Sequence, residues 1–306
     1  MKIVFMGTPA YATTILKALV NDVEMDVALL VTQEDKPVGR KQILTPPHTK
    51  AWIFEEDIGI DIYQPKSLRT EEACEKIASY QPDFIIVAAY GKLLPKEILA
   101  IAPCINLHAS LLPKYRGASP IQSTLLEGDT YAGVTSMLME EGLDTGAMLG
   151  FSYHRIQKEE TSGHLFDSLA HHAAHLTLQT LKHFTALLAL KQQESHASHC
   201  KKIKKEDGCI SFNEEAQEVM NRFRGLTPWP GVFLESGLKI LDMELADTKT
   251  SHEHAGVLYE VKKEGVVFTC KKGSLLLKRL QSPSKNPVDA RDYIRGKRLE
   301  HGDRLV

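Results

Sequence analysis

Residues 106–120 read NLHASLLPKYRGASP, and this stretch places a polar pair at the end of a predicted buried strand. The residues just before it are apolar, and Asn106 and His108 stand two positions apart, which puts both side chains on one face of a strand. The basic turn at 114–117 then leads into a predicted helix. In open α/β sheets, ligands bind at such carboxyl ends of strands. The alternative is a strand end that only hydrogen-bonds its own loop.

A second motif, GLDTG at residues 142–146, follows the apolar segment 134–139. An Asp between two glycines commonly caps a turn, and turn formation alone is one interpretation of Asp144. Near an imidazole, however, a carboxylate stabilises the protonated ring and fixes its orientation. An amide, an imidazole and a carboxylate without a required Ser or Cys nucleophile indicate direct acyl transfer, with the protein stabilising an oxyanion and moving protons. We therefore predict Asn106, His108 and Asp144 as catalytic residues.

The chain begins with the pattern of a βαβ unit. Residues 1–6 are too short an apolar run for a signal peptide and read as a buried strand, residues 10–19 are apolar at helical spacing, and residues 27–31 read as a second strand. The turn after the first strand holds one glycine instead of Gly-x-Gly-x-x-Gly, which excludes a nicotinamide dinucleotide site. We predict an α/β fold with a Rossmann-like, mostly parallel sheet.

Six segments carry a resemblance to known enzymes. Residues 106–113, 116–120 and 142–146 closely resemble the formyltransferases that use 10-formyltetrahydrofolate. The segments that look like those of the methionyl-tRNA formyltransferases in particular are FMGTP at 5–9, AYGK at 89–92 and PWPG at 228–231. Together these motifs extend, in order, over nearly the whole chain.

The resemblance implies a reaction and a donor. The formyl group on N10 of 10-formyltetrahydrofolate would pass to the free amine of initiator methionyl-tRNA, for use in translation initiation. Asn106 and His108 would stabilise the oxyanion, while Asp144 would hold His108 charged and help to move the proton. No metal is implied. The residues expected to line the pocket for the pterin of the folate are Tyr90, Gly91, Ser110, Leu111, Leu112 and Pro113.

The segment between residues 33 and 50 is rich in proline and basic residues, and it is long for an ordinary connection in such a sheet. Such a loop suggests a mobile functional element, although a solvated surface loop has the same composition. In methionyl-tRNA formyltransferases a loop at this place enters the acceptor stem of the tRNA. Arg40 and Lys41 look similar to its basic residues and are predicted to contact tRNA.

Composition indicates a soluble protein of one large or two ordinary domains. The 306 residues are 43% hydrophobic and 25% charged, with a net charge of −2. Residues 201–306 hold 20 Lys and Arg against 16 Asp and Glu, a charge of +4, whereas the remainder carries −6, which points weakly to an RNA contact. Five scattered cysteines without a Cys-x-x-Cys pair fit the reducing cytoplasm. We expect no membrane span, and a monomer.

The second half of the chain is predicted to form a separate domain. Residues 162–190 read as one long helix whose histidines lack a supporting carboxylate or Cys for metal binding. We place the catalytic domain at 1–190, a polar linker at 191–205, and a small domain of short strands at 206–306, OB-like by resemblance. Basic residues of this domain that are candidates for tRNA phosphates, or simply for solvated strand edges, are Lys262, Lys263, Lys271, Lys272, Lys278 and Arg279.

Three other functions stay open from the sequence. A glycinamide ribonucleotide transformylase would use the same three side chains but leaves the last ~100 residues without a role. A nucleotide-sugar N-formyltransferase shares a similar two-part plan, although the Arg40 loop and residues 228–231 favour tRNA. A noncatalytic RNA-binding protein on the same fold would have no need of Asn106, His108 and Asp144 together.

Overall fold

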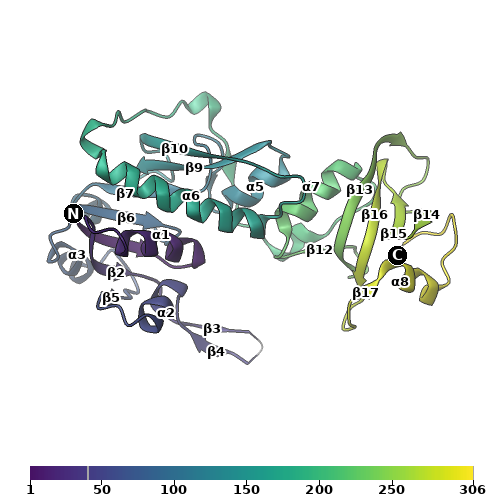
Figure 1. Cartoon of the computed structure of the whole chain (residues 1–306), viewed down its shortest axis with the longest axis horizontal. Helices are drawn as coiled ribbons and strands as arrows, with labels where there is room; N and C mark the ends of the chain where they lie inside the picture. The colour runs from purple at the N-terminus through teal and green to yellow at the C-terminus, as the bar shows by residue number, and fades with distance from the viewer. Residues whose placement is uncertain (40, 306) are drawn as a thin grey trace. The chain divides into compact units, whose positions relative to one another are not determined.

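The computed structural model describes residues 1–39 and 41–305, and the chain divides into two compact units. Unit 1 comprises Met1–Pro120, Tyr131–Ile156 and Leu165–Cys200. Unit 2 comprises Ile121–Thr130, Gln157–His164 and Lys201–Val306. Figure 1 follows the chain through both units.

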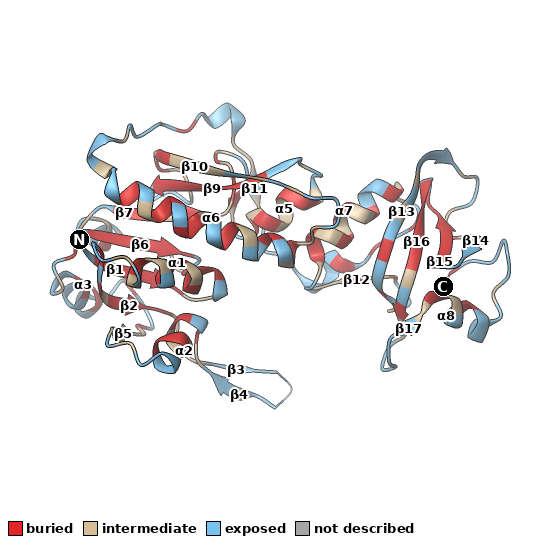
Figure 2. Cartoon of the chain, in the orientation of Figure 1, coloured by how far each residue is buried: buried red, intermediate tan, exposed pale blue. Residues whose placement is uncertain are grey.

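Unit 1 is built on a seven-stranded sheet in which five neighbouring strands pair in parallel, and the two strands at one edge join it through antiparallel pairing. In spatial order its strands are β10 (Met148–Arg155), β9 (Tyr131–Leu138), β7 (Cys104–His108), β6 (Phe84–Ala88), β1 (Lys2–Gly7), β2 (Asp26–Val31) and β5 (Asp61–Tyr63). The central strands are buried along their length because helices cover the sheet (Figure 2). The expected mostly parallel Rossmann-like sheet is therefore confirmed.

The connections between these strands contain helices, each with buried residues. α1 (Ala10–Val20) buries Ile15, Leu16 and Leu19, which recur at helical spacing. α3 (Glu71–Ala78) starts at Thr70, whose side chain accepts a hydrogen bond from the Ala73 amide. The remaining helices of this part of the chain are α2 (His48–Glu55), α4 (Lys96–Leu99), α5 (Pro120–Leu126) and α6 (Ser162–Lys182).

Strand register fixes where the predicted site lies. β7 pairs with β6 on one side and with β9 on the other, and Asn106 and His108 oppose Met137 and Thr135 of β9. Both polar residues lie at the carboxyl end of β7. Asp144 lies in the connection that leaves β9. Because β9 runs antiparallel to β7, with Leu138 opposite Ile105, this connection has to turn back toward Asn106 and His108.

Residues 33–50, predicted as a mobile functional loop, contain a short hairpin. β3 (Lys36–Val38) and β4 (Ile43–Thr45) pair antiparallel, and all six of their residues are exposed. In Figure 2 this hairpin is pale blue throughout its strands. Its base is held by Lys50, whose ammonium lies 2.9 Å from Asp35 and 2.8 Å from Gln64. The segment predicted as a mobile functional loop thus contains two paired, exposed strands.

The prediction of one helix over residues 162–190 is wrong at its carboxyl end, since α6 ends at Lys182. Long-range contacts compete with helical propensity there. The Lys182 ammonium lies 2.7 Å from Asp22, and the backbones of Met148 and Leu190 exchange two hydrogen bonds of 2.8 Å, which requires an extended chain. Residues of the predicted linker up to Cys200 belong to unit 1, where β11 (His199–Cys200) pairs with β8 (Arg116–Gly117).

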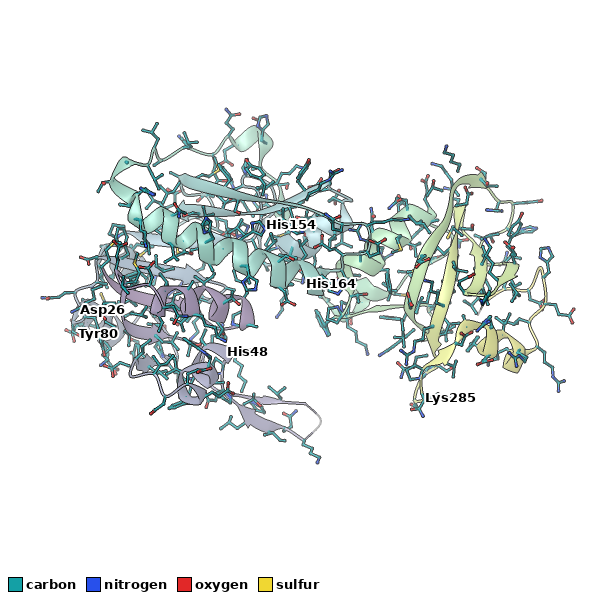
Figure 3. All side chains as sticks on the ribbon, in the orientation of Figure 1. Asp26, His48, Tyr80, His154, His164 and Lys285 are labelled. Carbon is teal, nitrogen blue, oxygen red and sulfur yellow. The ribbon has the colours of Figure 1, made fainter. Side chains whose placement is uncertain are left out.

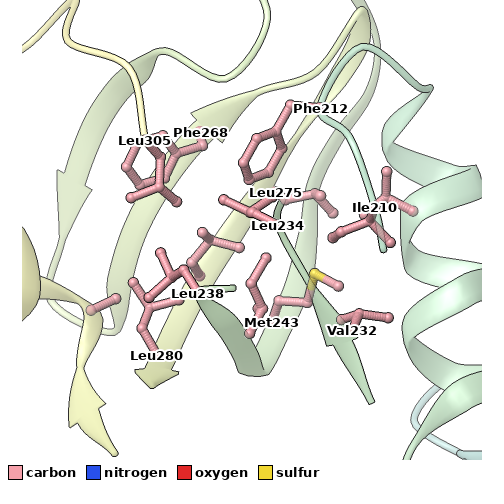
Figure 4. Packing of buried hydrophobic residues seen from close by; sticks show 14 of the residues in the cluster. Ile210, Phe212, Val232, Leu234, Leu238, Met243, Phe268, Leu275, Leu280 and Leu305 are labelled. Atoms are coloured by element: carbon pink, nitrogen blue, oxygen red, sulfur yellow. The ribbon is translucent and has the colours of Figure 1, made fainter. Parts of the chain in front are cut away.

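Unit 2 contains a sheet of antiparallel strands, as expected for the second domain. Along the sheet run β12 (Val232–Phe233), β13 (Lys239–Ser251), β16 (Lys272–Gln281), β15 (Gly265–Thr269) and β14 (Leu258–Lys262), with β17 (Val288–Asp289) beside β16. Its core includes Phe212 and Phe268, whose rings stack 6.1 Å apart, together with Met243 and Leu275 (Figure 4). The helices α7 (Ala216–Leu226) and α8 (Ala290–Lys297) each contribute buried residues to it.

None of the helices in the described part of the chain combines the length and apolar character needed to cross a lipid bilayer.

Candidate active site

The three predicted catalytic side chains converge at the carboxyl end of β7. The Asn106 amide nitrogen lies 3.5 Å from one carboxylate oxygen of Asp144, and His108 Nδ1 lies 3.6 Å from the other. The side chains of His108 and Asp144 are only 6% and 12% exposed. Electrostatic interactions are strengthened at such depth because little water screens them. An amide, an imidazole and a carboxylate therefore share one half-buried site, although they come from two separated segments.

The imidazole of His108 is engaged on both sides. Its Nε2 lies 2.9 Å from the carbonyl oxygen of Tyr115, and since a carbonyl only accepts, Nε2 is the donor. Its Nδ1 faces the Asp144 carboxylate, so a proton on this nitrogen would complete an ion pair. His108 can donate to a substrate oxygen only by giving up one of these partners. The Asn106 amide makes a 3.5 Å bond to Asp144, which is longer and weaker than the 2.9 Å bond of His108 Nε2.

The Asp144 carboxylate is positioned by backbone groups. The Gly117 amide donates to Asp144 Oδ2 at 2.8 Å, a charge-assisted bond. Asp144 itself has a φ of 54°, in the left-handed region that Asp tolerates better than most residues. At Gly146 a Cβ atom would lie 1.8 Å from the Leu138 carbonyl oxygen, so only glycine fits. The GLDTG motif thus forms a turn and also presents a carboxylate to the ring.

Two buried polar residues stabilise this turn: Gln192 binds it directly, and Arg116 binds Gln192. Gln192 is 4% exposed, and its amide nitrogen donates to the carbonyl oxygens of Asp144 and Gly146, both at 2.8 Å. Its oxygen accepts a 2.9 Å hydrogen bond from Arg116 Nε. The rest of the Arg116 guanidinium binds both carboxylate oxygens of Glu194, at 3.0 and 2.7 Å, and this contact lowers the pKa of Glu194 below its ordinary range.

The connection after β7, predicted to line the pterin pocket, is a closed loop. The Ser110 hydroxyl donates to the Lys114 carbonyl at 2.6 Å, so it is used within the loop. Buried Thr135 donates to the Ser110 carbonyl at 2.6 Å and accepts from the Leu112 amide at 3.0 Å. Leu112 is buried, whereas Leu111 and Pro113 are half-buried. Thr135 therefore ties this loop to β9.

The other two predicted pocket residues follow β6. Tyr90 is 1% exposed and its hydroxyl has no hydrogen-bond partner among the described residues, and burial raises the pKa of its phenol to about 12. The side chain of Tyr90 is thus part of the core. Its carbonyl accepts from the Gln33 amide at 2.8 Å. Exposed Gly91 has a φ of 79°, and a Cβ there would lie 2.7 Å from Gln33 Nε2, so the Gln33 side chain would have to move. Any ligand contact here would involve backbone groups.

The residues predicted to contact tRNA lie in different settings. Lys41 is exposed in the turn of the β3–β4 hairpin, and Arg40 lies outside the described residues. In unit 2, Lys272 pairs with Glu215 at 3.0 Å, and Lys278 pairs with Glu244. Those two lysines already have acidic partners.

The histidines of α6 do not assemble a metal site. Within residues 1–39 and 41–305, no group of three or more His, Cys, Asp or Glu side chains is arranged to hold a metal ion. His172 instead lies 2.6 Å from the Ser152 hydroxyl of β10 and edge-on to His154, which Figure 3 labels on that strand. Burial and the neighbouring histidines lower the pKa of His172.

Sequence reasoning missed the residues that support the site. Thr135 falls in the segment 134–139, which was interpreted as apolar, and Gln192 falls in a polar stretch interpreted as a linker. Buried Arg116 was noted only as part of a motif. Arg116 itself was an available signal, because its planar guanidinium fits a carboxylate and so indicates an acidic partner such as Glu194.

Family models cover both units of the chain. The model described as formyl transferase matches residues 1–181, and the model described as formyl transferase, C-terminal domain, matches residues 202–298.

The whole chain is also similar to a curated relative and to two solved structures. The methionyl-tRNA formyltransferase of a Nitratiruptor species is 52% identical over 303 residues, with 99% of each chain covered. The structure of WlaRD, a sugar 3N-formyl transferase, has a TM-score of 0.66 at 18% identity and covers 94% of this chain and 99% of its own. HypX from Aquifex aeolicus in complex with tetrahydrofolic acid has a TM-score of 0.60 at 12% identity, covering 96% of this chain and 47% of its own.

Proposed function

This chain belongs to the methionyl-tRNA formyltransferase family, and on that premise we propose that it transfers a formyl group from 10-formyltetrahydrofolate to the amine of initiator methionyl-tRNA. The observation that carries the proposal is the convergence of Asn106 and His108 on Asp144, at 3.5 and 3.6 Å. The likeness to WlaRD and HypX, at 18% and 12% identity, supports the fold alone.

The proposed reaction begins when the α-amine of the methionyl group attacks the formyl carbon, which creates a tetrahedral oxyanion. The Asn106 amide donates to that oxygen, since its present bond to Asp144 is long at 3.5 Å. For His108 to share this task, Nε2 must exchange the Tyr115 carbonyl for the oxyanion. Catalytic hydrogen bonds commonly tighten only once substrate is bound.

The proton of the attacking amine must reach the departing N10. We assign its transfer to the Asp144 and His108 pair, in which the carboxylate faces Nδ1 at 3.6 Å. The Gly117 amide holds Asp144 Oδ2 at 2.8 Å, so the carboxylate stays in place while the proton moves. One proton leaves the amine as its bond to carbon forms, and it is delivered to N10 as the oxyanion collapses and the carbon–N10 bond breaks. Both proton transfers lower the barriers of their steps.

The family uses formyl-tetrahydrofolate as its donor, and we propose the 10-formyl form with its pterin held by the loops after β6 and β7. These strands are neighbours in the sheet, so Gly91 and Pro113 come from adjacent strand ends. Both keep solvent-accessible surface. Backbone groups in such loops suit the flat, hydrogen-bonding edge of a pterin.

We further propose that Lys41 and Arg40, the latter outside the described residues, contact the tRNA through the β3–β4 hairpin. The exposed ribbon brings a lysine into the solvent, where it can meet phosphates. The domain division, the monomeric state and the cytoplasmic location stay predictions. All five cysteines are free thiols, as a reducing compartment would keep them.

A substrate comparison tests this function. Purified protein and labelled 10-formyltetrahydrofolate would be incubated separately with charged initiator tRNA, charged elongator tRNA and an amino-sugar nucleotide. Formylation of the initiator tRNA at a kcat/KM well above both other acceptors is expected. Preferred formylation of the sugar nucleotide would support the nucleotide-sugar alternative, and RNA binding without any transfer would support a noncatalytic role.

A further inference from the structure

Gln192 is a buried amide that has no role in the reaction described above. It is 4% exposed and lies in the stretch between α6 and β11 of unit 1, far in sequence from both site motifs. A buried amide must satisfy its own hydrogen-bonding groups, so its partners indicate what it does.

Those partners include the main-chain carbonyls of Asp144 and Gly146, in the turn that presents the Asp144 carboxylate. Each amide hydrogen of Gln192 can serve one carbonyl, that of Asp144 or that of Gly146, and both bonds are 2.8 Å. Its oxygen accepts from Arg116 Nε at 2.9 Å, which also shows which side of the amide is the oxygen. With both donors and the acceptor in use, the amide has one orientation.

The residue that follows Arg116 also holds the turn. Gly117, next to Arg116, donates its amide to Asp144 Oδ2 at 2.8 Å. Asp144 is thus held at its side chain by Gly117 and at its main chain by Gln192, while its φ is 54°. A residue in this left-handed conformation lacks a steric preference that would keep it there, so its hydrogen bonds must do so.

We propose that Gln192 is a positioning residue for formyl transfer, clamping the 144–146 turn so that the Asp144 carboxylate stays against His108 and Asn106. This inference rests on the proposed function. Gln192 touches no reacting atom and acts through Asp144, because reacting groups displaced by ~1 Å can lose ~10²-fold in rate.

The test is the substitution Gln192→Glu, which keeps an oxygen acceptor for Arg116 but replaces both donors with an oxygen that faces two carbonyls. We expect kcat to fall by about 10- to 100-fold, with KM for donor and tRNA unchanged within about twofold. The matched control is Gln193→Glu, the same change at the adjacent exposed residue, which should leave kcat unchanged.

A double-mutant cycle separates positioning from a general structural effect. In single-turnover transfer, the loss caused by Gln192→Glu should largely disappear when Asp144 is already Asn, because both changes disable the same carboxylate. A loss that multiplies in full on that background would overturn the inference, as would near-normal kcat for Gln192→Glu. A Gln192→Glu protein that no longer unfolds cooperatively would also overturn it, since Gln192 would then support the whole unit.

The same cycle distinguishes this inference from the proposed function. Near-normal transfer by Asp144→Asn alone would contradict the proposed role of the carboxylate. Severe loss in Asp144→Asn together with an unaffected Gln192→Glu would contradict only the role of Gln192.

Discussion

Replacing Asn106 with Ala tests the oxyanion donor. In the resting structure the Asn106 amide makes one long bond, 3.5 Å to Asp144, so its removal should cost the fold no more than about 0.5–1.5 kcal/mol. In the transition state the same amide would face a full oxyanion inside a half-buried site. Loss of one such donor raises the barrier by about 2.7–4 kcal/mol, equivalent to ~10²–10³ in kcat.

The two effects are measured separately. Single-turnover transfer of a labelled formyl group to charged initiator tRNA gives the chemical step, and equilibrium titration with a folate gives donor affinity. We expect the rate to fall by ~10²–10³ or more while donor affinity and the thermal midpoint change little. The exposed Asn213, changed to Ala in the same way, should behave as wild type.

A loss of only a few-fold in Asn106→Ala would contradict the assignment, because an oxyanion donor acts mainly in the transition state. So would a rate loss matched by an equal loss of folate affinity, since Asn106 would then contribute to ground-state binding.

Three further changes probe the surroundings of the site. Thr135→Val leaves two buried backbone groups of the loop after β7 unpaired and should cost about 1–3 kcal/mol in urea unfolding, with a higher KM for the folate. Gly146→Ala places a Cβ 1.8 Å from the Leu138 carbonyl, so the turn must shift, and we expect ~10²-fold lower kcat in the transfer assay. Because Arg116 lowers the pKa of Glu194, this pair stabilises the fold fully above pH ~4.3 and loses its effect as the pH falls through the lowered value. The stability difference between wild type and Glu194→Gln should therefore be present at neutral pH and vanish in acid.

Two matched substitutions serve as controls for these predictions. Thr177→Val removes a buried hydroxyl that donates to a carbonyl within its own helix, and it should leave the folate KM unchanged. Gly296→Ala adds a Cβ with nothing within 4 Å, so transfer should not change. A raised folate KM in Thr177→Val, normal kcat in Gly146→Ala, or a Glu194→Gln difference that grows in acid would each refute the corresponding reasoning.

Periodicity and motif position were sufficient for the parallel sheet. Its strands are short apolar runs between helices of ordinary spacing, and the strand predicted at 27–31 corresponds to β2, Asp26–Val31. Such strands are buried on both faces, so they appear in the sequence as nearly continuous apolar runs. The position of Asn106 and His108 was predictable for the same reason, because they lie toward the carboxyl end of β7. The approach of Asp144 does not follow from strand order, because β9 runs antiparallel to β7.

The elements that sequence reasoning missed depend on partners far along the chain. The β3 and β4 strands have three residues each, all exposed, so no apolar alternation marks them. α6 stops at Lys182 because extended pairing at Leu190 and the contact of Phe184 with Phe84, 4.9 Å between ring centroids, outweigh local helical preference. Neither competing interaction is visible in a local window.

The residues that support the site could not be predicted from the sequence, for a related reason. Gln192 lies in a segment with no apolar period, and its burial follows only from the place of Arg116 and the 144–146 turn in the folded unit. Polar residues that satisfy buried carbonyls leave no periodic signature. Composition therefore suggested a linker where the chain in fact packs into unit 1.

The most direct test of the account is single-turnover formyl transfer by Asp144→Asn, a change that keeps the shape of the side chain and removes its charge. The carboxylate lies 3.6 Å from His108 Nδ1, so we predict a rate lowered by ~10² or more, with cooperative unfolding and folate affinity retained. Near-normal transfer would contradict the account, because Asp144 would then serve only to shape its turn.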